Sequence, residues 1–264
     1  MEILSYGFMQ RAIITGIVVG ILTGVISVFV VLRRVAFVGS GISHAAFGGV
    51  AIGFLAGINP IVTAMIYSIL VAFGIERISA KGRVAEDTAI GVFFSSSMAL
   101  GIVLIGLSKS YNVDLFGYLF GSILAISEKE MWLTIGITLV ILTTLVMIIK
   151  ELLSITFNEE LAVVSGIPTR LIKSIFLVSM AVAIVMSIKV VGIILVSALL
   201  VIPGAVAQLL SRNFYSMILI SCFIALFSTI TGLYLSYQFD LSPGGMIVLI
   251  ITASFFAAFL KGKR

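Results

Sequence analysis

Successive apolar runs, several of them about 20 residues long, are the feature that most constrains the fold of this chain. A helix of that length crosses the ~30 Å hydrocarbon core of a bilayer. Hydrophobic residues make up 61% of the 264 residues and charged residues only 10%, and no soluble core needs that much apolar surface. We therefore predict an all-α, polytopic membrane protein in contact with the lipid bilayer.

Nine apolar runs can be distinguished, each bounded to within a few residues. They are 12–32, 43–57, 60–76, 88–107, 131–149, 172–188, 190–210, 214–235 and 244–260. A single helix over 174–210 would be ~55 Å long and would put Lys189 near the bilayer centre, at a cost of about 2.5–3.5 kcal/mol. A turn at Lys189 removes both problems. Because the first and the shortest runs are borderline, we predict eight or nine transmembrane helices in a single domain, 1–264.

The basic residues gather at the ends of these runs, as orientation signals do. Twelve of the 16 lysines and arginines lie at 33–34, 77–83, 150–173, 212 and 261–264. These twelve fall on one side if the segments alternate, and that side is predicted to be the cytoplasm, with the N-terminus outside. The formal charge of +5 therefore indicates orientation, and we expect no nucleic-acid binding. The single cysteine, Cys222, excludes a disulfide framework and a thiolate cluster.

The only histidine, His44, falls inside a predicted span, in a segment that contains Gly39, Gly41, Gly48 and Gly49. These glycines predict an irregular backbone, which a membrane protein tolerates only where it is buried or lines a cavity. An ionisable side chain at that depth is usually part of an ion or substrate path. The alternative is a histidine that is hydrogen-bonded between packed helices, and the residues alone leave both open.

Two further features of the spans have two interpretations each. Pro203 and Gly204 lie in the middle of a run and predict a kink, which suits a static packing bend and a gating hinge about equally. Glu86 and Asp87 begin a span on the predicted cytoplasmic side. Stabilisation of the helix N-terminus by these carboxylates is favoured over a role in metal exit.

The only sizeable polar segment, 150–173, contains a predicted short helix. Asn158 can accept hydrogen bonds from first-turn amides, and Glu159 and Glu160 stand where the helix dipole favours anions. Gly166 and Pro168 end the helix. Two turns of helix cannot bury a core of their own, so this helix needs a surface, either the protein's own cytoplasmic face or a partner.

Five motifs in order resemble one branch of the ATP-binding-cassette importer permeases, the zinc/manganese/iron permeases. The spacing of Glu160, Ala162 and Gly166 is similar to the coupling-helix signature of these importers. The other stretches are Arg33-Arg34 with Gly39-Ser40-x-x-Ser43-His44-Ala45 and Gly49-Val50, then 86–91, 118–122 and 191–203. The resemblance covers nearly the whole chain.

This resemblance implies a homodimeric permease of the prokaryotic cell (inner) membrane with a fold like that of the cobalamin and metal-chelate permeases. It implies that a coupling helix at about 158–168 docks on a cytoplasmic ATP-binding subunit, through Asn158, Glu159, Glu160, Ala162 and Gly166. It also implies an extracytoplasmic metal-binding protein that delivers the ion. The chain contains no G-x-x-x-x-G-K-[ST] loop, so we expect a transport subunit and not an enzyme, with no cofactor of its own.

The resemblance places His44, Ser40 and Ser43 on the metal path, with Gly39, Gly41, Gly48, Gly49, Pro203 and Gly204 as hinges. Family members commonly carry Asp four residues before the histidine, where this chain has Ser40. A hydroxyl is a weaker ligand for a divalent cation, and imidazole suits zinc whereas manganese favours carboxylate and water. Zinc is therefore the favoured cargo, with manganese and iron as alternatives.

Two other functions remain as alternatives. An importer of iron chelates or cobalamin would use a similar dimer, but it needs a wider path and has no reason for the histidine motif. A gradient-driven secondary transporter also uses broken helices, but it should show intramembrane acidic residues, and no predicted span contains a clear one. A lone histidine cannot build a catalytic metal site or an acid–base pair, which disfavours an intramembrane enzyme.

Overall fold

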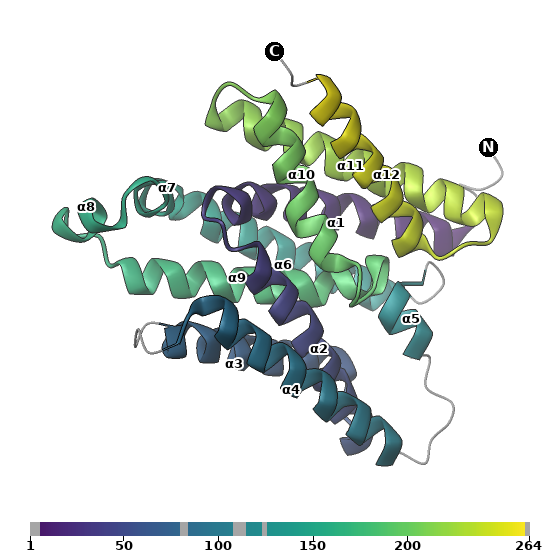
Figure 1. The fold of residues 1–264 in the computed structure, drawn as a ribbon. Coiled ribbons are helices and arrows are strands. Elements are labelled where there is room, and N and C mark those ends of the chain that lie inside the picture. The colour runs from purple at the N-terminus through teal and green to yellow at the C-terminus, as the bar shows by residue number, and fades with distance from the viewer. Residues whose placement is uncertain (1–5, 80–83, 108–114, 123–125, 262–264) are drawn as a thin grey trace. The chain divides into compact units, whose positions relative to one another are not determined.

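The computed structural model describes residues 6–79, 84–107, 115–122 and 126–261, and its regular elements are helices (Figure 1). They are α1 (Gly7–Leu32), α2 (Ala36–Ala56), α3 (Pro60–Ser79), α4 (Glu86–Leu107), α5 (Leu115–Phe120), α6 (Glu128–Met147), α7 (Ile149–Phe157), α8 (Glu159–Val164), α9 (Thr169–Val191), α10 (Val196–Leu210), α11 (Phe214–Phe239) and α12 (Pro243–Lys261). In this part of the chain eight helices are long and apolar enough to cross a membrane, and α10 is a shorter apolar helix of 15 residues. The prediction of an all-α, polytopic membrane protein is confirmed.

Each of the nine predicted apolar runs coincides with one helix, but the turn between the sixth and seventh runs is not at Lys189. Helix α9 continues through Lys189 to Val191, and the chain turns at Gly192, where φ is +90°. The lysine does not end the helix because Glu130 Oε1 lies 3.3 Å from its Nζ and the Tyr118 ring lies 5.1 Å from it. Paired in this way, the ammonium group is stabilised at the end of the span. The basic residues predicted at 81, 83, 263 and 264 lie outside the described residues.

The chain divides into two compact units. The first unit comprises 1–36, 114–139 and 186–264, and the second comprises 37–113 and 140–185. Helices α6 and α9 each contribute residues to both units. The predicted coupling segment and His44 both belong to the second unit.

The first unit is held together by close packing of α1 on α10 and α11. Gly16, Gly20 and Gly24 of α1 recur every four residues, and side chains or backbone of α11 lie within 3.4 Å of a Cβ built on each of them. Small residues at this spacing let membrane helices approach closely. The Ser221 hydroxyl of α11 strengthens the contact by donating to the Gly24 carbonyl at 2.7 Å.

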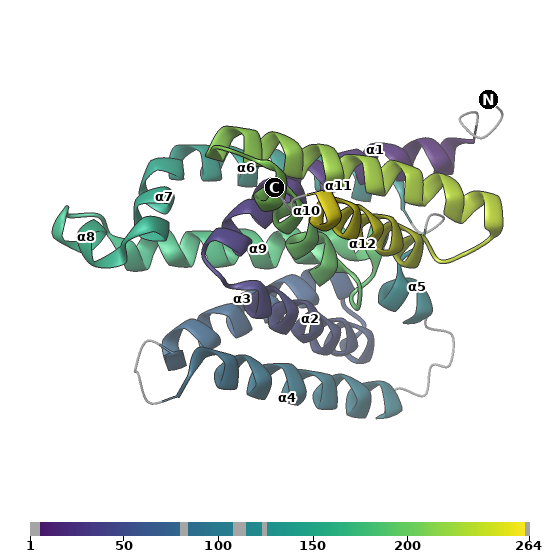
Figure 2. The ribbon, with the colours of Figure 1, turned by 45° about the horizontal axis from the view of Figure 1, so that its top comes forward.

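The second unit places α2 beside α3 and α4 (Figures 1 and 2). The irregular backbone predicted for α2 is wrong, because 36–56 is helical throughout. Its glycines serve packing instead: a Cβ on Gly49 would meet Ala64 Cα of α3 at 2.5 Å, and one on Gly48 would meet the Ser97 carbonyl of α4 at 2.9 Å. In a membrane no water replaces broken helical hydrogen bonds, so a glycine-rich span stays helical when its neighbours pack against it.

Candidate metal path and coupling helix

His44 is anchored by the helical turn that precedes it. Its Nδ1 lies 2.9 Å from the Ser40 carbonyl oxygen. Because a carbonyl only accepts hydrogen bonds, Nδ1 carries the proton of the neutral imidazole and Nε2 keeps its lone pair. The Ser43 hydroxyl donates to the same carbonyl at 2.9 Å and lies 3.3 Å from Nδ1. Proteins orient metal-binding histidines in this way, with one ring nitrogen bonded to a carbonyl and the other free for the ion.

The imidazole is only partly buried and faces α4. Its ring centroid lies 4.4 Å from that of Phe94, with 44° between the planes. Neighbouring side chains of α2 are fully buried, Ser43 among them. The three residues predicted for the metal path, Ser40, Ser43 and His44, thus share one turn of α2, and only His44 carries a side chain that binds transition metals strongly.

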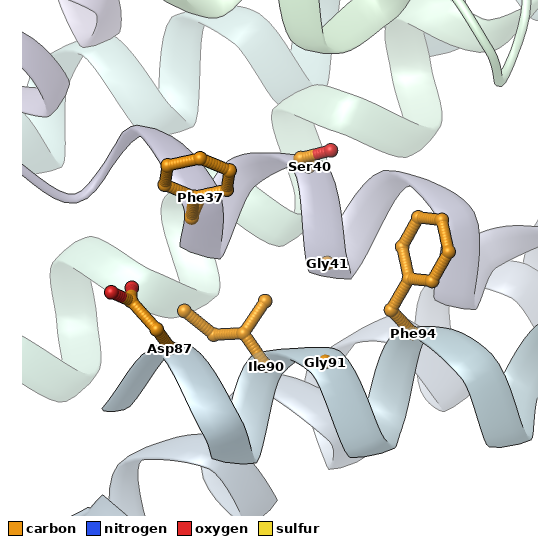
Figure 3. A pocket seen from close by; sticks show the side chains of 7 residues that line it. All are labelled: Phe37, Ser40, Gly41, Asp87, Ile90, Gly91 and Phe94. Carbon is orange, nitrogen blue, oxygen red and sulfur yellow. The ribbon is translucent and has the colours of Figure 1, made fainter. Parts of the chain in front are cut away.

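A cavity of about 380 Å³ lies between α2 and α4, next to this turn (Figure 3). Its lining residues are Phe37, Ser40, Gly41, Asp87, Ile90, Gly91 and Phe94. In Figure 3, the side chains of Asp87, Ile90 and Phe94 follow one another along the α4 side. Ser40 and Phe94, which both contact His44, therefore line the same cavity as the Asp87 carboxylate at the start of α4.

In the described part of the chain, no group of three or more His, Cys, Asp or Glu side chains is close enough to hold a metal ion. The predicted metal path thus rests on one strong ligand, His44, among the described residues. A divalent ion at His44 would complete its coordination with water or with oxygen and nitrogen atoms from elsewhere. Such sparse ligation suits an ion in transit, which must bind well enough to enter and weakly enough to leave.

Helix α8 has the caps that were predicted for it. The Asn158 Oδ1 accepts from the Leu161 amide at 3.0 Å, and the Glu159 carboxylate pairs with Lys173 at the start of α9. At the C-terminal end, Gly166 takes a φ of +80° and the Ile167 amide donates to the Ala162 carbonyl at 3.0 Å. These contacts cap both ends of α8, the short helix that connects α7 and α9.

The apolar side chains of α8 and of Phe157, the last residue of α7, are exposed, and Ala162 is the exception. Ala162 is fully buried, whereas Phe157, Leu161 and Val164 are 81%, 63% and 84% exposed. The helix stands at the turn between α7 and α9 (Figures 1 and 2). An exposed apolar surface on a short, firmly capped helix is typical of a protein–protein contact.

Pro203 and Gly204 lie inside α10, where they meet α1. The Gly204 amide donates to the Ser27 hydroxyl at 2.7 Å, and a Cβ on Gly204 would meet the Ser27 carbonyl at 2.4 Å. All three residues are buried. These predicted hinge residues therefore stand far along the sequence from the α2 glycines and belong to the other unit.

A second glycine cluster, which the sequence reasoning did not single out, joins α5, α9 and α12 in the first unit. We call Gly121, Gly192 and Gly244 the glycine junction. A Cβ on Gly192 would meet the Leu119 carbonyl at 2.3 Å, and one on Gly121 would meet the Val190 carbonyl at 2.5 Å. Two of its members lie in stretches that the resemblance included, Gly121 in 118–122 and Gly192 in 191–203.

In the described part of the chain, eight helices are long and apolar enough to define a multi-pass membrane protein. The chain belongs to the ABC 3 transport family, which it matches over residues 5–262. The predicted family is therefore confirmed. The protein is a multi-pass permease of the cell membrane, a transport subunit and not an enzyme.

Curated relatives match along nearly the full chain. The manganese transport system membrane protein MntC of Listeria innocua is 40% identical over 262 residues, 99% of this chain and 93% of the relative. The manganese import system permease protein ScaB of Streptococcus parasanguinis is 36% identical and covers 98% of this chain and 92% of the relative. The preference for zinc that was inferred from the imidazole finds no support among these relatives.

Two solved structures share the fold. PsaBC from Streptococcus pneumoniae, determined in complex with a Fab, aligns with a TM-score of 0.89 and 37% identity, over 98% of this chain and 93% of the other. A metal-chelate type ABC transporter in an inward-facing conformation aligns with a TM-score of 0.77 and 14% identity, over 98% and 88%. The predicted likeness to the metal-chelate permeases is thereby confirmed at the level of the fold.

Proposed function

We propose that this chain carries a divalent transition metal into the cell, with manganese as its main cargo, by alternating access driven by ATP hydrolysis in a separate cytoplasmic subunit. The names of the two relatives above support manganese. Family membership supports coupling to ATP and disfavours the gradient-driven alternative. The imidazole argument for zinc is outweighed, because an ion that passes through need not match the site's equilibrium preference.

The observation that carries this proposal is the hydrogen bond from His44 Nδ1 to the Ser40 carbonyl. It leaves Nε2 available inside a span, next to a cavity, in a chain with no other histidine. Histidine at that depth is costly unless it has a function. We infer that Nε2 contacts the metal as it crosses, and that water and a second copy of the chain supply further ligands in a homodimer.

Ser40 keeps this contact weak. The family resemblance implies a carboxylate at this position, where this chain has a hydroxyl. A neutral oxygen holds Mn²⁺ less tightly than an anionic one. The Ser40 contribution to His44 is made by the backbone carbonyl, which any residue would supply. Weak ligation favours release toward the cytoplasm, which an importer requires.

The exposed apolar surface of α8 supports its role as the coupling helix. Leu161 and Val164 would be buried by a groove of the ATP-binding subunit, and the caps at Asn158 and Gly166 would transmit its movement as a rigid unit. The absence of a phosphate-binding loop from the sequence fits a chain that relies on a partner for ATP hydrolysis. On the opposite face, an extracytoplasmic binding protein would deliver the metal.

The test is manganese uptake by cells that lack their own manganese importers and express this permease with its partner subunits. We expect His44→Ala to lower uptake at least tenfold at an unchanged amount of permease in the membrane. Tyr67→Phe is the matched control, because it removes a hydrogen bond to Ser97 in the same unit at 3.2 Å without touching His44.

Normal uptake by the His44→Ala variant would show that the histidine only packs, and would contradict the proposed path. Zinc is measured in parallel in the same cells. Zinc uptake without manganese uptake by the wild-type permease would keep the transport role and overturn the choice of metal.

A further inference from the structure

The only acidic side chain of α3, Glu76, lies in the last turn of that helix. The C-terminal end of a helix favours cations, so the stability of α3 does not explain a carboxylate there. Its partner comes from α9, where the Ser174 Oγ lies 3.0 Å and 3.3 Å from the two carboxylate oxygens and donates to this carboxylate. The contact is partly buried and joins residues that are 98 positions apart in the sequence. It therefore binds two helices of the second unit to each other.

The residue before Ser174 holds the predicted coupling helix. Lys173 forms an ion pair with Glu159 in the first turn of α8. Neighbouring residues of a helix point about 100° apart around its axis. Lys173 and Ser174 therefore hold two different elements at the same level of α9, α8 through the ion pair and α3 through the hydroxyl.

A second pair of neighbours, Ile75 and Glu76 of α3, continues the connection to the predicted metal path. Ile75 is 1% exposed, and a Cβ built on Gly41 of α2 would lie 3.8 Å from its Cδ1. Gly41 follows Ser40, whose carbonyl accepts from His44. At two further glycines of α2 the backbone of α3 comes within 3 Å of such a Cβ. Helices packed this closely transmit a displacement instead of absorbing it.

We propose that the contact between Glu76 and Ser174 couples α8 to α2, so that a displacement of the coupling helix by the ATP-binding subunit moves His44. The contacts from α8 through α9 and α3 to α2 all lie within the second unit, which comprises 37–113 and 140–185. Coupling between distant sites is carried by such continuous chains of packed side chains and hydrogen bonds. Glu76 and Ser174 are positioning residues that act through His44. The inference rests on the proposed import function and adds the route by which ATP hydrolysis reaches the metal path.

The experiment measures the manganese accumulated per ATP hydrolysed, in proteoliposomes that contain the assembled transporter. Ser174→Ala should lower this ratio at least threefold, because α8 still docks on the ATP-binding subunit but moves α2 less. The rate of ATP hydrolysis should stay within twofold of wild type. Ser174→Thr keeps a hydroxyl at this position and should hold the ratio within twofold of wild type. Ser254→Ala is the matched control, because the Ser254 hydroxyl donates at 2.9 Å to the Ile250 carbonyl of its own helix.

The same contact can be removed from α3. Glu76→Ala should lower the ratio as far as Ser174→Ala does, and the double variant should lower it no further, because two residues that act through one contact are not additive. Ser174→Cys has nearly the shape of serine but a weak donor. It should also lower the ratio, and it carries the test if an alanine variant does not assemble.

An unchanged ratio in Ser174→Ala would overturn this role of the contact, and so would an equal loss in Ser254→Ala. Losses that multiply in the double variant would also overturn it, because they would show that Glu76 and Ser174 act independently. The wild type separates the two proposals. A wild-type transporter that accumulates no manganese with ATP contradicts the import function itself, whereas an active wild type with an unaffected Ser174→Ala variant contradicts only the coupling route.

Discussion

At the scale of single residues, glycine has two physical roles in this chain. In α1 and α2 it removes a side chain so that a neighbouring helix can approach, and the backbone stays helical. At Gly192 it also permits a backbone conformation, with φ at +90°, that costs other residues about 1–2 kcal/mol. The glycine junction combines both demands at one position.

Gly192→Ala should therefore lower the thermal stability of the purified permease. A Cβ there would stand 2.3 Å from the Leu119 carbonyl, so the backbone of α5 must move in addition to the conformational cost. We expect the apparent melting temperature in detergent to fall by several degrees. Gly136→Ala in α6 is the control, because nothing lies within 4 Å of its Cβ, and alanine gains about 0.5–1 kcal/mol over glycine in a helix. Equal melting temperatures for the two variants would contradict the junction.

Ser27 offers a second test at this scale. Ser27→Ala removes the hydroxyl to which the Gly204 amide donates at 2.7 Å, and both groups are buried. In membrane proteins such a bond contributes about 0.6–2 kcal/mol. We expect a modest loss of stability with transport retained if the contact is a static bend. A changed transport rate at normal stability would instead support the predicted hinge at Pro203 and Gly204.

At the scale of elements, α8 shows how far local sequence determines local structure. Its caps could be predicted from Asn158 and Gly166 alone, because both act on groups within a few residues. The same is true of the long helices, because an apolar run in lipid forms a helix whose backbone hydrogen bonds are all made within the segment. The helical course of α2 could not be predicted, because its glycines are held by Ala64, Ser97 and other residues of α3 and α4 that are distant in sequence.

The end of α9 was misplaced for the same reason. The partners of Lys189, which are Glu130 and Tyr118, are brought to it only by the fold. The position of Asp87 on the cavity wall likewise depends on the packing of α4 against α2. Contacts between elements therefore account for the differences between the predicted and the observed site.

Gly166→Val should uncouple ATP hydrolysis from transport and leave the permease folded. A side chain at this position meets no neighbouring atom, but valine disfavours the φ of +80° with which the chain leaves α8. The C-terminal cap of the docking helix should therefore be lost. Gly57→Val is the matched control, because Gly57 has a φ of +67° and equally open space at the other end of the predicted membrane. We expect metal-stimulated ATPase activity of the assembled transporter to fall only in Gly166→Val. Equal effects of both variants would argue against coupling through α8.

At the scale of the whole molecule, the distribution of basic residues predicts which face meets the cytoplasm. In a Cys222→Ala background, a cysteine at position 164 should react with a membrane-impermeant maleimide only after the cells are opened. A cysteine at position 59 should react in intact cells. Val164 and Asn59 are both exposed, so access depends on the side of the membrane and not on burial. Reversed labelling would overturn the orientation, and with it the docking of α8 on a cytoplasmic subunit.

ATP-driven metal import is tested by manganese accumulation in proteoliposomes that contain this permease and its ATP-binding subunit. Manganese should accumulate only when both subunits and ATP are present, and the permease alone should hydrolyse no ATP. His44→Ala should abolish accumulation. Accumulation driven by a proton or sodium gradient without ATP would contradict coupling to ATP hydrolysis, and undiminished accumulation by the His44→Ala variant would contradict a metal path through His44.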